Sequence, residues 1–204
     1  RFYYQNIVRV PGGRSEASEF GSAVHHALEK FFSKRKEAEG EFPEKEVLLS
    51  DFRWHMYRFR ESFTEEGLKR RIEDGHRVLS ELHDAYLAEW KKMDAYSVEK
   101  SFSGVVVDGV PLRGKLDLMQ FDGNQVTIFD YKTGEPDKSA DRLKPPTASK
   151  PKGGDYWRQA VFYKILVEGF KRKDFEVSKT IFQYVEPDST REYLQKEIVA
   201  SPDD

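Results

Sequence analysis

Two acidic residues and a lysine in the middle of the chain have the types and the spacing of a hydrolytic metal site. Asp117 lies in the segment 109–134, GVPLRGKLDLMQFDGNQVTIFDYKTG, and Asp130 and Lys132 follow in its second half. Alternating apolar residues on both sides of the sequence Asp-Gly-Asn predict two strands joined by a tight turn. The three polar side chains are expected on one face of this hairpin, because side chains alternate along a strand with a period of two.

The register of the hairpin decides how close the two acids come. If Gly123 and Asn124 form the loop, Asp117 lies opposite Asp130, with their Cβ atoms about 5 Å apart. If Asp122 and Gly123 form the loop instead, the pair becomes diagonal but stays on the same face. In both registers the two carboxylates share one face of the sheet.

Two carboxylates beside an ammonium group are costly to bring together unless a cation lies between the acids. Magnesium takes oxygen ligands and keeps several waters, so two protein carboxylates and the phosphate oxygens of a substrate would suit it. Lys132 could then orient a water or stabilise developing charge. The alternative is a solvated face with a surface ion pair. The D-x-K spacing and the apolar strand around it, at Val126, Ile128 and Phe129, make this the weaker interpretation.

A helix expected at about 15–36 carries a second set of candidate residues. Gly21, His25 and Glu29 are spaced by four, so they line one side of the helix at the edge of its apolar stripe. A small residue, an imidazole and an acid in this row could let another group approach the helix closely. A lone histidine beside an apolar face is more often an ordinary core or surface residue, and spacing alone favours that interpretation. The adjacent His26 points about 100° away and cannot easily share a ligand with His25.

A helix expected at 155–170 carries Gln159 and Tyr163 one turn apart, with Arg158 beside them. Apolar residues nearly all round predict that this helix is largely buried. Gln159 and Tyr163 could touch a nucleotide, or they could form a buried hydrogen-bonded pair.

The segment 135–154 is rich in Pro, Lys and Ser and lacks apolar periodicity, which predicts a long loop. Its basic residues follow the acidic cluster directly and could hold a phosphate backbone: Lys138, Arg142, Lys144, Lys150 and Lys152. A solvated flexible linker is an equally good interpretation.

The rest of the pattern predicts an α/β fold with a helical N-terminal half and a mixed sheet flanked by helices. Further helices are expected at about 43–61 and 64–93. Residues 2–10 could form a strand or a helix remnant. Strands are expected near 96–107, 110–121, 125–131 and 177–186, with another at 192–199.

The composition excludes several kinds of site. The chain has 204 residues, 38% of them hydrophobic, a net charge of −2 and no cysteine. One domain over 1–204 is expected, without disulfides, thiolate zinc sites or an iron–sulfur cluster held by this chain. No apolar run of membrane-spanning length is present, and a reducing cytoplasm is the expected location. A nucleic-acid partner would need a local basic surface. Because the chain begins with Arg and opens on what looks like mid-element sequence, we expect it to be part of a longer protein.

Four motifs together resemble the RecB-type nucleases of the PD-(D/E)XK superfamily, which have the restriction-endonuclease-like fold. They are G-x-x-x-H-x-x-x-E at 21–29, G-x-x-D at 114–117, D-Y-K-T-G at 130–134 and Q-x-x-x-Y at 159–163. Each motif is weak alone, but the four occur in the family's order and cover roughly residues 15–170. The sequences RFYYQNIVRVPG and GGDYWRQAVFYK are also similar to the nuclease domain at the C-terminus of UvrD/Rep-type bacterial helicases.

The resemblance implies roles that the spacing does not give. His25, Asp117 and Asp130 would bind Mg²⁺ or Mn²⁺ together with the backbone carbonyl of Tyr131, so the resemblance reverses the interpretation of His25 as an ordinary histidine.

The remaining motif residues would act beside the metal. Lys132 would serve the attacking water, and Gln159 and Tyr163 would support the site and touch the DNA. Many relatives hold an iron–sulfur cluster through four cysteines, so this chain would belong to a cluster-free branch.

We therefore expect a metal-dependent DNA nuclease, and specifically an exonuclease of DNA repair or recombination in bacteria. A helicase domain would be its partner, in the same polypeptide or in another subunit. The alternative is a catalytically inactive DNA-binding or scaffolding domain of such a complex, but the acid and lysine positions are all present. A zinc hydrolase that uses His25 fits poorly, because no second histidine at ligand spacing accompanies it.

Overall fold

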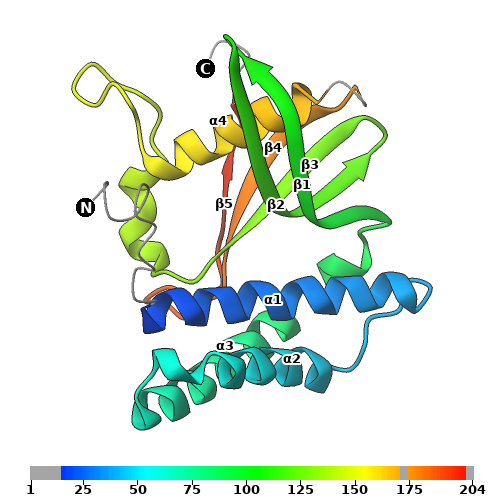
Figure 1. The fold of residues 1–204 in the computed structure, drawn as a ribbon, viewed down its shortest axis with the longest axis vertical. Coiled ribbons are helices and arrows are strands. Elements are labelled where there is room, and N and C mark those ends of the chain that lie inside the picture. Colours follow the sequence, from blue (N-terminus) through cyan, green and yellow to red (C-terminus); the bar gives the residue numbers. More distant parts are fainter. Residues whose placement is uncertain (1–14, 171–173, 201–204) are drawn as a thin grey trace.

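The computed structural model describes residues 15–170 and 174–200. Within these residues the chain forms a five-stranded mixed sheet, with a layer of helices on one face and one helix on the other (Figure 1). The predicted α/β fold with a helical N-terminal half is therefore confirmed. The strand or helix remnant expected at 2–10 lies outside the described residues.

The order of the strands in the sheet follows their order in the chain. The strands are β1 (Ala95–Val107), β2 (Val110–Asp122), β3 (Gln125–Lys132), β4 (Glu176–Tyr184) and β5 (Gln195–Ile198). β3 and β4 are parallel, whereas the other neighbours are antiparallel. A parallel pair needs a long connection. Here the connection contains the 3₁₀ helix η3 (Pro136–Arg142) and the helix α4 (Asp155–Glu168).

The hairpin of β2 and β3 has the first of the two predicted registers. Asp122 pairs with Gln125, so the two-residue loop starts at Gly123. Gly123 has a φ of 62°, which glycine adopts without steric cost. The ladder between the two strands ends one pair before Asp117 and Asp130, and the strands separate there.

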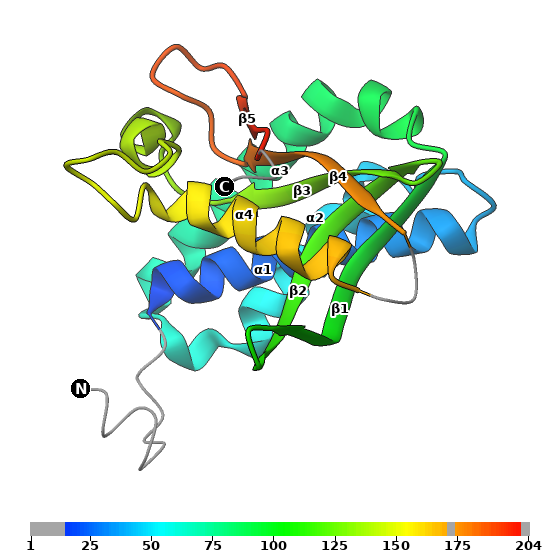
Figure 2. The ribbon, with the colours of Figure 1, turned by 90° about the horizontal axis from the view of Figure 1, so that it is seen from above.

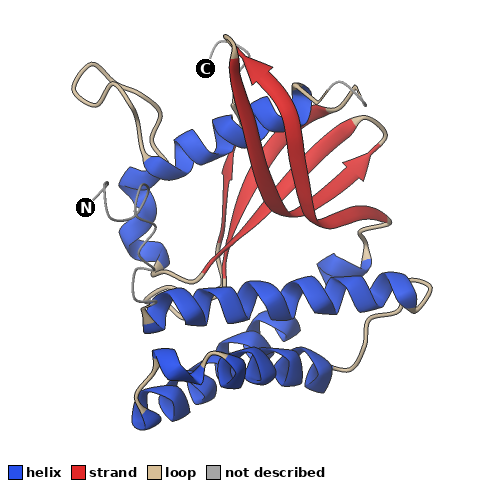
Figure 3. Cartoon of the chain, in the orientation of Figure 1, coloured by secondary structure: helices blue, strands red, loops and turns tan. Residues whose placement is uncertain are grey.

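The helices α1 (Glu16–Glu37), α2 (Lys45–Arg58) and α3 (Glu65–Lys91) form one layer against the sheet (Figure 3). α1 begins where the Ser15 hydroxyl accepts a hydrogen bond from the Ser18 N–H, at 3.2 Å. The Thr64 hydroxyl caps α3 in the same way. The apolar stripes of the three helices share a core with side chains of the sheet, including Phe31, Phe52, Leu82, Trp90, Leu118, Phe129 and Ile181.

α4 covers the opposite face of the sheet (Figure 2). Leu166 and Tyr163 of α4 pack with Val126 and Ile128 of β3 in a second core. Gly114 of β2 lies directly beneath the helix, because a Cβ atom there would come within 2.4 Å of Leu166 Cδ1. The missing side chain at Gly114 therefore sets how closely α4 approaches the sheet.

Several element boundaries differ from the sequence expectation. α2 runs from Lys45 to Arg58, shorter than the expected 43–61, since a separate 3₁₀ turn (η2, Arg60–Ser62) follows it. The segment 135–154 contains η3 and is not entirely irregular. Pro136 lies in the first turn of η3, where its missing N–H costs no hydrogen bond. None of the helices in residues 15–170 and 174–200 is both long and apolar enough to cross a membrane.

Candidate functional site

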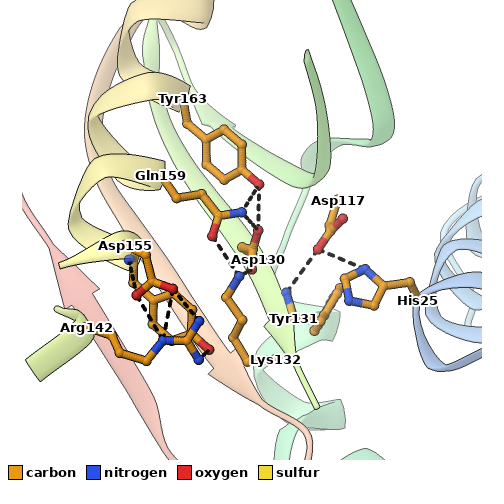
Figure 4. A network of polar contacts seen from close by, with 10 residues as sticks. His25, Asp117, Asp130, Tyr131, Lys132, Arg142, Asp155, Gln159 and Tyr163 are labelled. Carbon is orange, nitrogen blue, oxygen red and sulfur yellow. Dashed lines mark hydrogen bonds and ion pairs between the residues drawn. The ribbon is translucent and has the colours of Figure 1, made fainter. Parts of the chain in front are cut away.

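Asp130 lies at the centre of a buried polar network between β3 and α4 (Figure 4). The residue is only 3% exposed. Its Oδ1 accepts hydrogen bonds from the Tyr163 hydroxyl, at 2.6 Å, and from Gln159 Nε2, at 2.9 Å. Its Oδ2 lies 2.6 Å from Lys132 Nζ. One strand and one helix thus fix this carboxylate from three directions.

Gln159 connects the acid to the lysine. Its Oε1 accepts a hydrogen bond from Lys132 Nζ at 2.8 Å, while its Nε2 donates to Asp130 and to the Tyr163 hydroxyl. Because each end of the amide has a partner of the opposite kind, the amide cannot turn over without losing these bonds. The Lys132 ammonium also lies 4.5 Å from the centroid of the Tyr156 ring, a favourable cation–π contact.

His25 and Asp117 form a second group beside the first (Figure 4). His25 Nδ1 lies 3.1 Å from Asp117 Oδ2, and the same oxygen accepts a hydrogen bond from the Tyr131 N–H at 3.0 Å. Tyr131 directly follows Asp130, so the backbone of β3 links the two groups. The structure thus brings His25 to the acids, as the family resemblance implies and as spacing alone does not.

The pKa shifts of the site have identifiable causes. Burial raises the pKa of the Asp130 carboxyl, and the charge of Asp117 raises it further, against the opposing effects of Lys132 and Tyr163. Burial alone would lower the pKa of His25. The hydrogen bond and charge of Asp117, with the charge of Asp130, outweigh burial, so the pKa of His25 is raised. The pKa of Asp130 is thus raised because burial and the charge of Asp117 outweigh the attraction of Lys132.

Two glycines let helices approach the site closely. A Cβ atom at Gly21 would lie 3.2 Å from Thr133 Oγ1, so α1 passes close to the loop that follows β3. Gly114 likewise lets α4 approach the opposite face of the sheet closely. At Gly134, by contrast, a Cβ atom would meet nothing within 4 Å. The last residue of the D-Y-K-T-G motif therefore has no such steric role.

The donor atoms of the two groups suit a hard divalent cation, although they are not gathered into a cage. Among the described residues, no three His, Cys, Asp or Glu side chains lie close enough together to hold a metal ion. Asp130 Oδ2 is buried, and its one partner is the Lys132 ammonium at 2.6 Å. Carboxylate oxygens are ligands that Mg²⁺ and Mn²⁺ prefer, whereas an imidazole is more typical of transition-metal ions. The donor chemistry therefore fits, and Asp130 Oδ2 is an oxygen available for coordination.

The basic residues of the segment 135–154 are largely engaged with neighbouring groups. Lys138 pairs with Glu135 at 2.7 Å, and Lys144 pairs with Asp141 at 2.6 Å. Lys150 lies 3.8 Å from Asp141. Arg158, on α4, donates hydrogen bonds to the carbonyls of Lys152 and Gly153. Neighbouring acids thus offset much of the positive charge expected in this segment.

Arg142 joins this segment to α4. Its Nε donates to Asp155 Oδ1 at 2.9 Å, and its guanidinium lies 3.7 Å from the centroid of the Tyr156 ring. Asp155 is the first residue of α4, so the contact fixes the end of the helix that carries Gln159. Sequence reasoning missed this pairing. The one signal for it was an acid in the first turn of a helix, and that position is common for other reasons.

A cavity of about 490 Å³ opens beside His25, and Glu29 and Thr133 also line it. Glu99 of β1 lines it too and forms an ion pair with Lys115. Glu99 has a φ of 50°, which is uncommon for a residue other than glycine. The sequence reasoning gave Glu99 no role, because nothing in a strand pattern signals a left-handed residue.

Comparison with known proteins identifies one family. The family model described as the PD-(D/E)XK nuclease superfamily matches residues 1–204. A solved structure titled "Crystal structure of SSO0001" is similar to this chain with a TM-score of 0.35 and 16% sequence identity. The similarity covers 71% of this chain and 61% of that chain, so this chain spans less than two thirds of that protein. No curated protein sequence matches the chain.

Proposed function

This chain belongs to the PD-(D/E)XK nuclease superfamily, and from that premise we propose that it is a metal-dependent deoxyribonuclease that hydrolyses phosphodiester bonds. The observation that carries the proposal is the network around Asp130. It fixes a buried carboxylate, an ammonium group and an amide beside a histidine–aspartate pair. These groups can together bind a cation, hold a water and contact a phosphate.

We propose that the metal, Mg²⁺ or Mn²⁺, is held by His25, Asp117, Asp130 and the backbone carbonyl of Tyr131. When bound, such an ion supplies stabilisation of the negative charge that develops on the phosphate. The raised pKa of Asp130 supports this role, because a bound cation would favour the charged carboxylate. Asp130 Oδ2 supports it as well, since this buried oxygen has the Lys132 ammonium as its one partner.

Lys132 is proposed to act on the water and the phosphate. An ammonium group has three N–H donors. Asp130 Oδ2 and Gln159 Oε1 take two directions around Lys132 Nζ, and the aromatic rings of Tyr156 and Phe182 also lie close to it. The third N–H is proposed to contact an attacking water or a phosphate oxygen when substrate binds. Gln159 and Tyr163 act as positioning residues, since both bind Oδ1 of Asp130 and so orient Oδ2.

Cleavage of linear DNA tests the proposal. We expect the wild-type protein to degrade single- or double-stranded DNA with Mg²⁺ or Mn²⁺, and EDTA, Asp130→Ala or Lys132→Ala to abolish degradation. Asp122→Ala, which removes an exposed acid at the hairpin turn, is the matched control and should retain activity. Equal degradation by wild type and Asp130→Ala, or none by either, would contradict the proposal. A protein that binds DNA but has no Asp117-dependent affinity for Mn²⁺ in calorimetry would instead be an inactive DNA-binding domain.

We further propose that the protein is a RecB-type exonuclease acting in DNA repair or recombination in the bacterial cytoplasm, with a helicase in the same polypeptide or in a partner subunit. The order and spacing of the four motifs support this. Digestion of DNA labelled at one end tests the exonuclease assignment, because an exonuclease releases mononucleotides or short fragments from that end, whereas an endonuclease also cuts closed circles. Purification of the full-length protein from its native cells tests the association with a helicase.

A further inference from the structure

An exposed aromatic pair on α2 has no role in the site described above. Trp54 and Tyr57 are 53% and 52% exposed, whereas the other two tryptophans, Trp90 and Trp157, are buried. Trp54 and Tyr57 are three residues apart on a helix, so their side chains are neighbours. Large aromatic side chains gathered on a surface commonly mark a binding site.

The exposed neighbours of this pair along the chain are basic, whereas Tyr57 also lines a hollow with Glu65, Glu66 and Glu73 of α3. In the segment 53–60, every exposed residue is aromatic or basic: Arg53, Trp54, Tyr57, Arg58 and Arg60. We call these five residues the α2 aromatic surface. The segment contains no acidic residue. The Trp54 side of the surface, where Arg58 lies, is therefore the part that suits a polyanion, although the whole chain has a net charge of −2.

The α2 aromatic surface adjoins the candidate active site through α1. The His26 ring stacks on the Trp54 ring, with 5.7 Å between centroids and 27° between planes. His25, the preceding residue, contacts Asp117, and both histidines line the same cavity. A strand held at the catalytic groups could thus follow this cavity past His26 to Trp54.

We propose that the α2 aromatic surface stacks unpaired bases of a single-stranded DNA substrate whose backbone is held at the neighbouring active site. This inference rests on the proposed nuclease function for its choice of substrate. The Arg58 guanidinium lies 5.2 Å from the centroid of the Trp54 ring. A base can take its place over that ring and release Arg58 to contact a phosphate. Stacking tolerates any sequence, because every base has an aromatic face.

Binding measurements in EDTA test the inference without cleavage. The probes are a fluorescein-labelled oligothymidylate of about 20 nucleotides, a length sufficient to span such a surface, and a blunt duplex of the same length, both followed by anisotropy. Trp54→Ala is expected to weaken binding of the single strand about 5- to 150-fold, the effect of losing one stacked base. Tyr57→Ala should act in the same direction, Trp54→Phe should retain most of the affinity, and duplex binding should change little.

Salt dependence adds a readout that a purely structural role would not change. Arg58→Ala is expected to reduce the slope of log affinity against log salt by about 0.7 for the single strand. Arg113→Ala, which removes an exposed arginine from β2, is the charge-matched control and should leave the slope unchanged. Thermal unfolding of each variant verifies that it is folded, as expected for changes at exposed side chains.

The two proposals can fail separately. A thymidine p-nitrophenyl phosphodiester is too short to extend from the catalytic groups to α2, so Trp54→Ala should cleave it as the wild type does. If the wild type degrades DNA while Trp54→Ala binds the single strand equally well, the surface inference is overturned and the nuclease stands. If nothing is cleaved but Trp54→Ala still weakens single-strand binding, the nuclease proposal falls and the surface inference stands. Self-association lost in Trp54→Ala, with unchanged DNA binding, would assign the surface to a protein contact and overturn the inference.

Discussion

The two acids of the candidate site have contrasting surroundings. The Asp130 carboxylate is buried and contacts three side chains, from β3 and α4. The Asp117 side chain is 17% exposed and contacts one imidazole and one backbone N–H. The Asp130 half of the site is thus a closed network, whereas the Asp117 half adjoins a cavity. The comparison indicates that one half fixes positions before a ligand arrives and the other leaves room for the ligand.

The topology of the sheet accounts for this contrast. β3 pairs with β4 through Lys132, so the backbone at Asp130 is enclosed on that side, and α4 covers its side chain. The ladder between β2 and β3 has already ended at Asp117. Asp117 therefore lies where two strands separate, and its carboxylate takes the place of a strand partner by accepting the Tyr131 N–H.

Removing each acid in turn should give the largest effects and separate catalysis from stability. We expect Asp130→Ala and Asp117→Ala each to reduce cleavage at least about 100-fold. Asp130→Ala should lower the free energy of unfolding by about 3 kcal/mol, the low end for breaking a buried ion pair, because Lys132 keeps its charge in a partly buried position without that partner. Asp117→Ala should lower it by about 1–2 kcal/mol, the cost of an unsatisfied Tyr131 N–H.

Urea unfolding in EDTA measures this difference in stability. Asp122→Ala serves as the control for loss of an acid and should change neither quantity. Equal destabilisation by the two site variants would remove the contrast between a closed and an open half.

A methyl group added at each of two glycines compares the helix contacts of the two halves. Gly114→Ala should lower the free energy of unfolding by about 1–3 kcal/mol, since the new Cβ would clash with Leu166. It should also reduce cleavage, because α4 carries Gln159. Gly21→Ala meets only the Thr133 hydroxyl at 3.2 Å, so we expect less than about 1 kcal/mol. Gly134→Ala is the control. Thermal unfolding and a cleavage assay measure the effects of the variants. A larger loss of stability in Gly21→Ala than in Gly114→Ala would show that α1, and not α4, makes the tighter contact.

The pKa of His25 should report the charge of the open half in metal-free protein. Because the pKa is raised, protonated His25 stabilises the fold fully below its unfolded pKa of about 6.5, and this contribution is lost as pH rises through the folded pKa. Asp117→Asn should lower the pKa, since the hydrogen bond and most of the attraction disappear while burial remains. Asp130→Asn should lower it less. Imidazole NMR titration in EDTA measures both, and an equal shift in the two variants would contradict the separation into two groups.

The lysines of the segment 135–154 should give the smallest effects. Lys138→Ala and Lys144→Ala each remove one exposed ion pair, so we expect changes within about 0.5 kcal/mol in unfolding. DNA affinity should change by less than about threefold, because an adjacent acid already offsets each charge. A tenfold loss of DNA affinity in either variant would show that these pairs open to bind phosphate.

The local pattern of the sequence predicted the parts of the site that depend on neighbours along the chain. Asp130 and Lys132 share a face because of strand alternation, and the turn sequence left two registers for the hairpin, of which the structure has the first. Gln159 and Tyr163 were placed together by helix spacing. The structure confirms these contacts, whereas the catalytic roles of these residues remain predictions.

The parts that sequence reasoning missed depend on packing between distant segments. His25 contacts Asp117 only because α1 packs against the end of the hairpin, and the helix spacing itself suggested an ordinary histidine. The pairing of Arg142 with Asp155 brings the segment 135–154 back onto α4. Lys138 and Lys144 instead pair with acids three residues away within the segment, which its irregular sequence did not signal. Trp54 and Tyr57 lie on a helix for which the sequence predicted only the range, about 43–61, because periodicity identifies the buried face and gives no meaning to an exposed one.

The connection from β3 to β4 also determines when the closed half can exist. Asp130 and Lys132 are synthesised before Gln159, Tyr163 and the whole of β4. A nascent chain that ends before α4 therefore has an Asp130 carboxylate without its helix partners, Gln159 and Tyr163. The complete set of candidate catalytic groups exists only once α4 has been synthesised, some 25 residues after Asp130 in the chain.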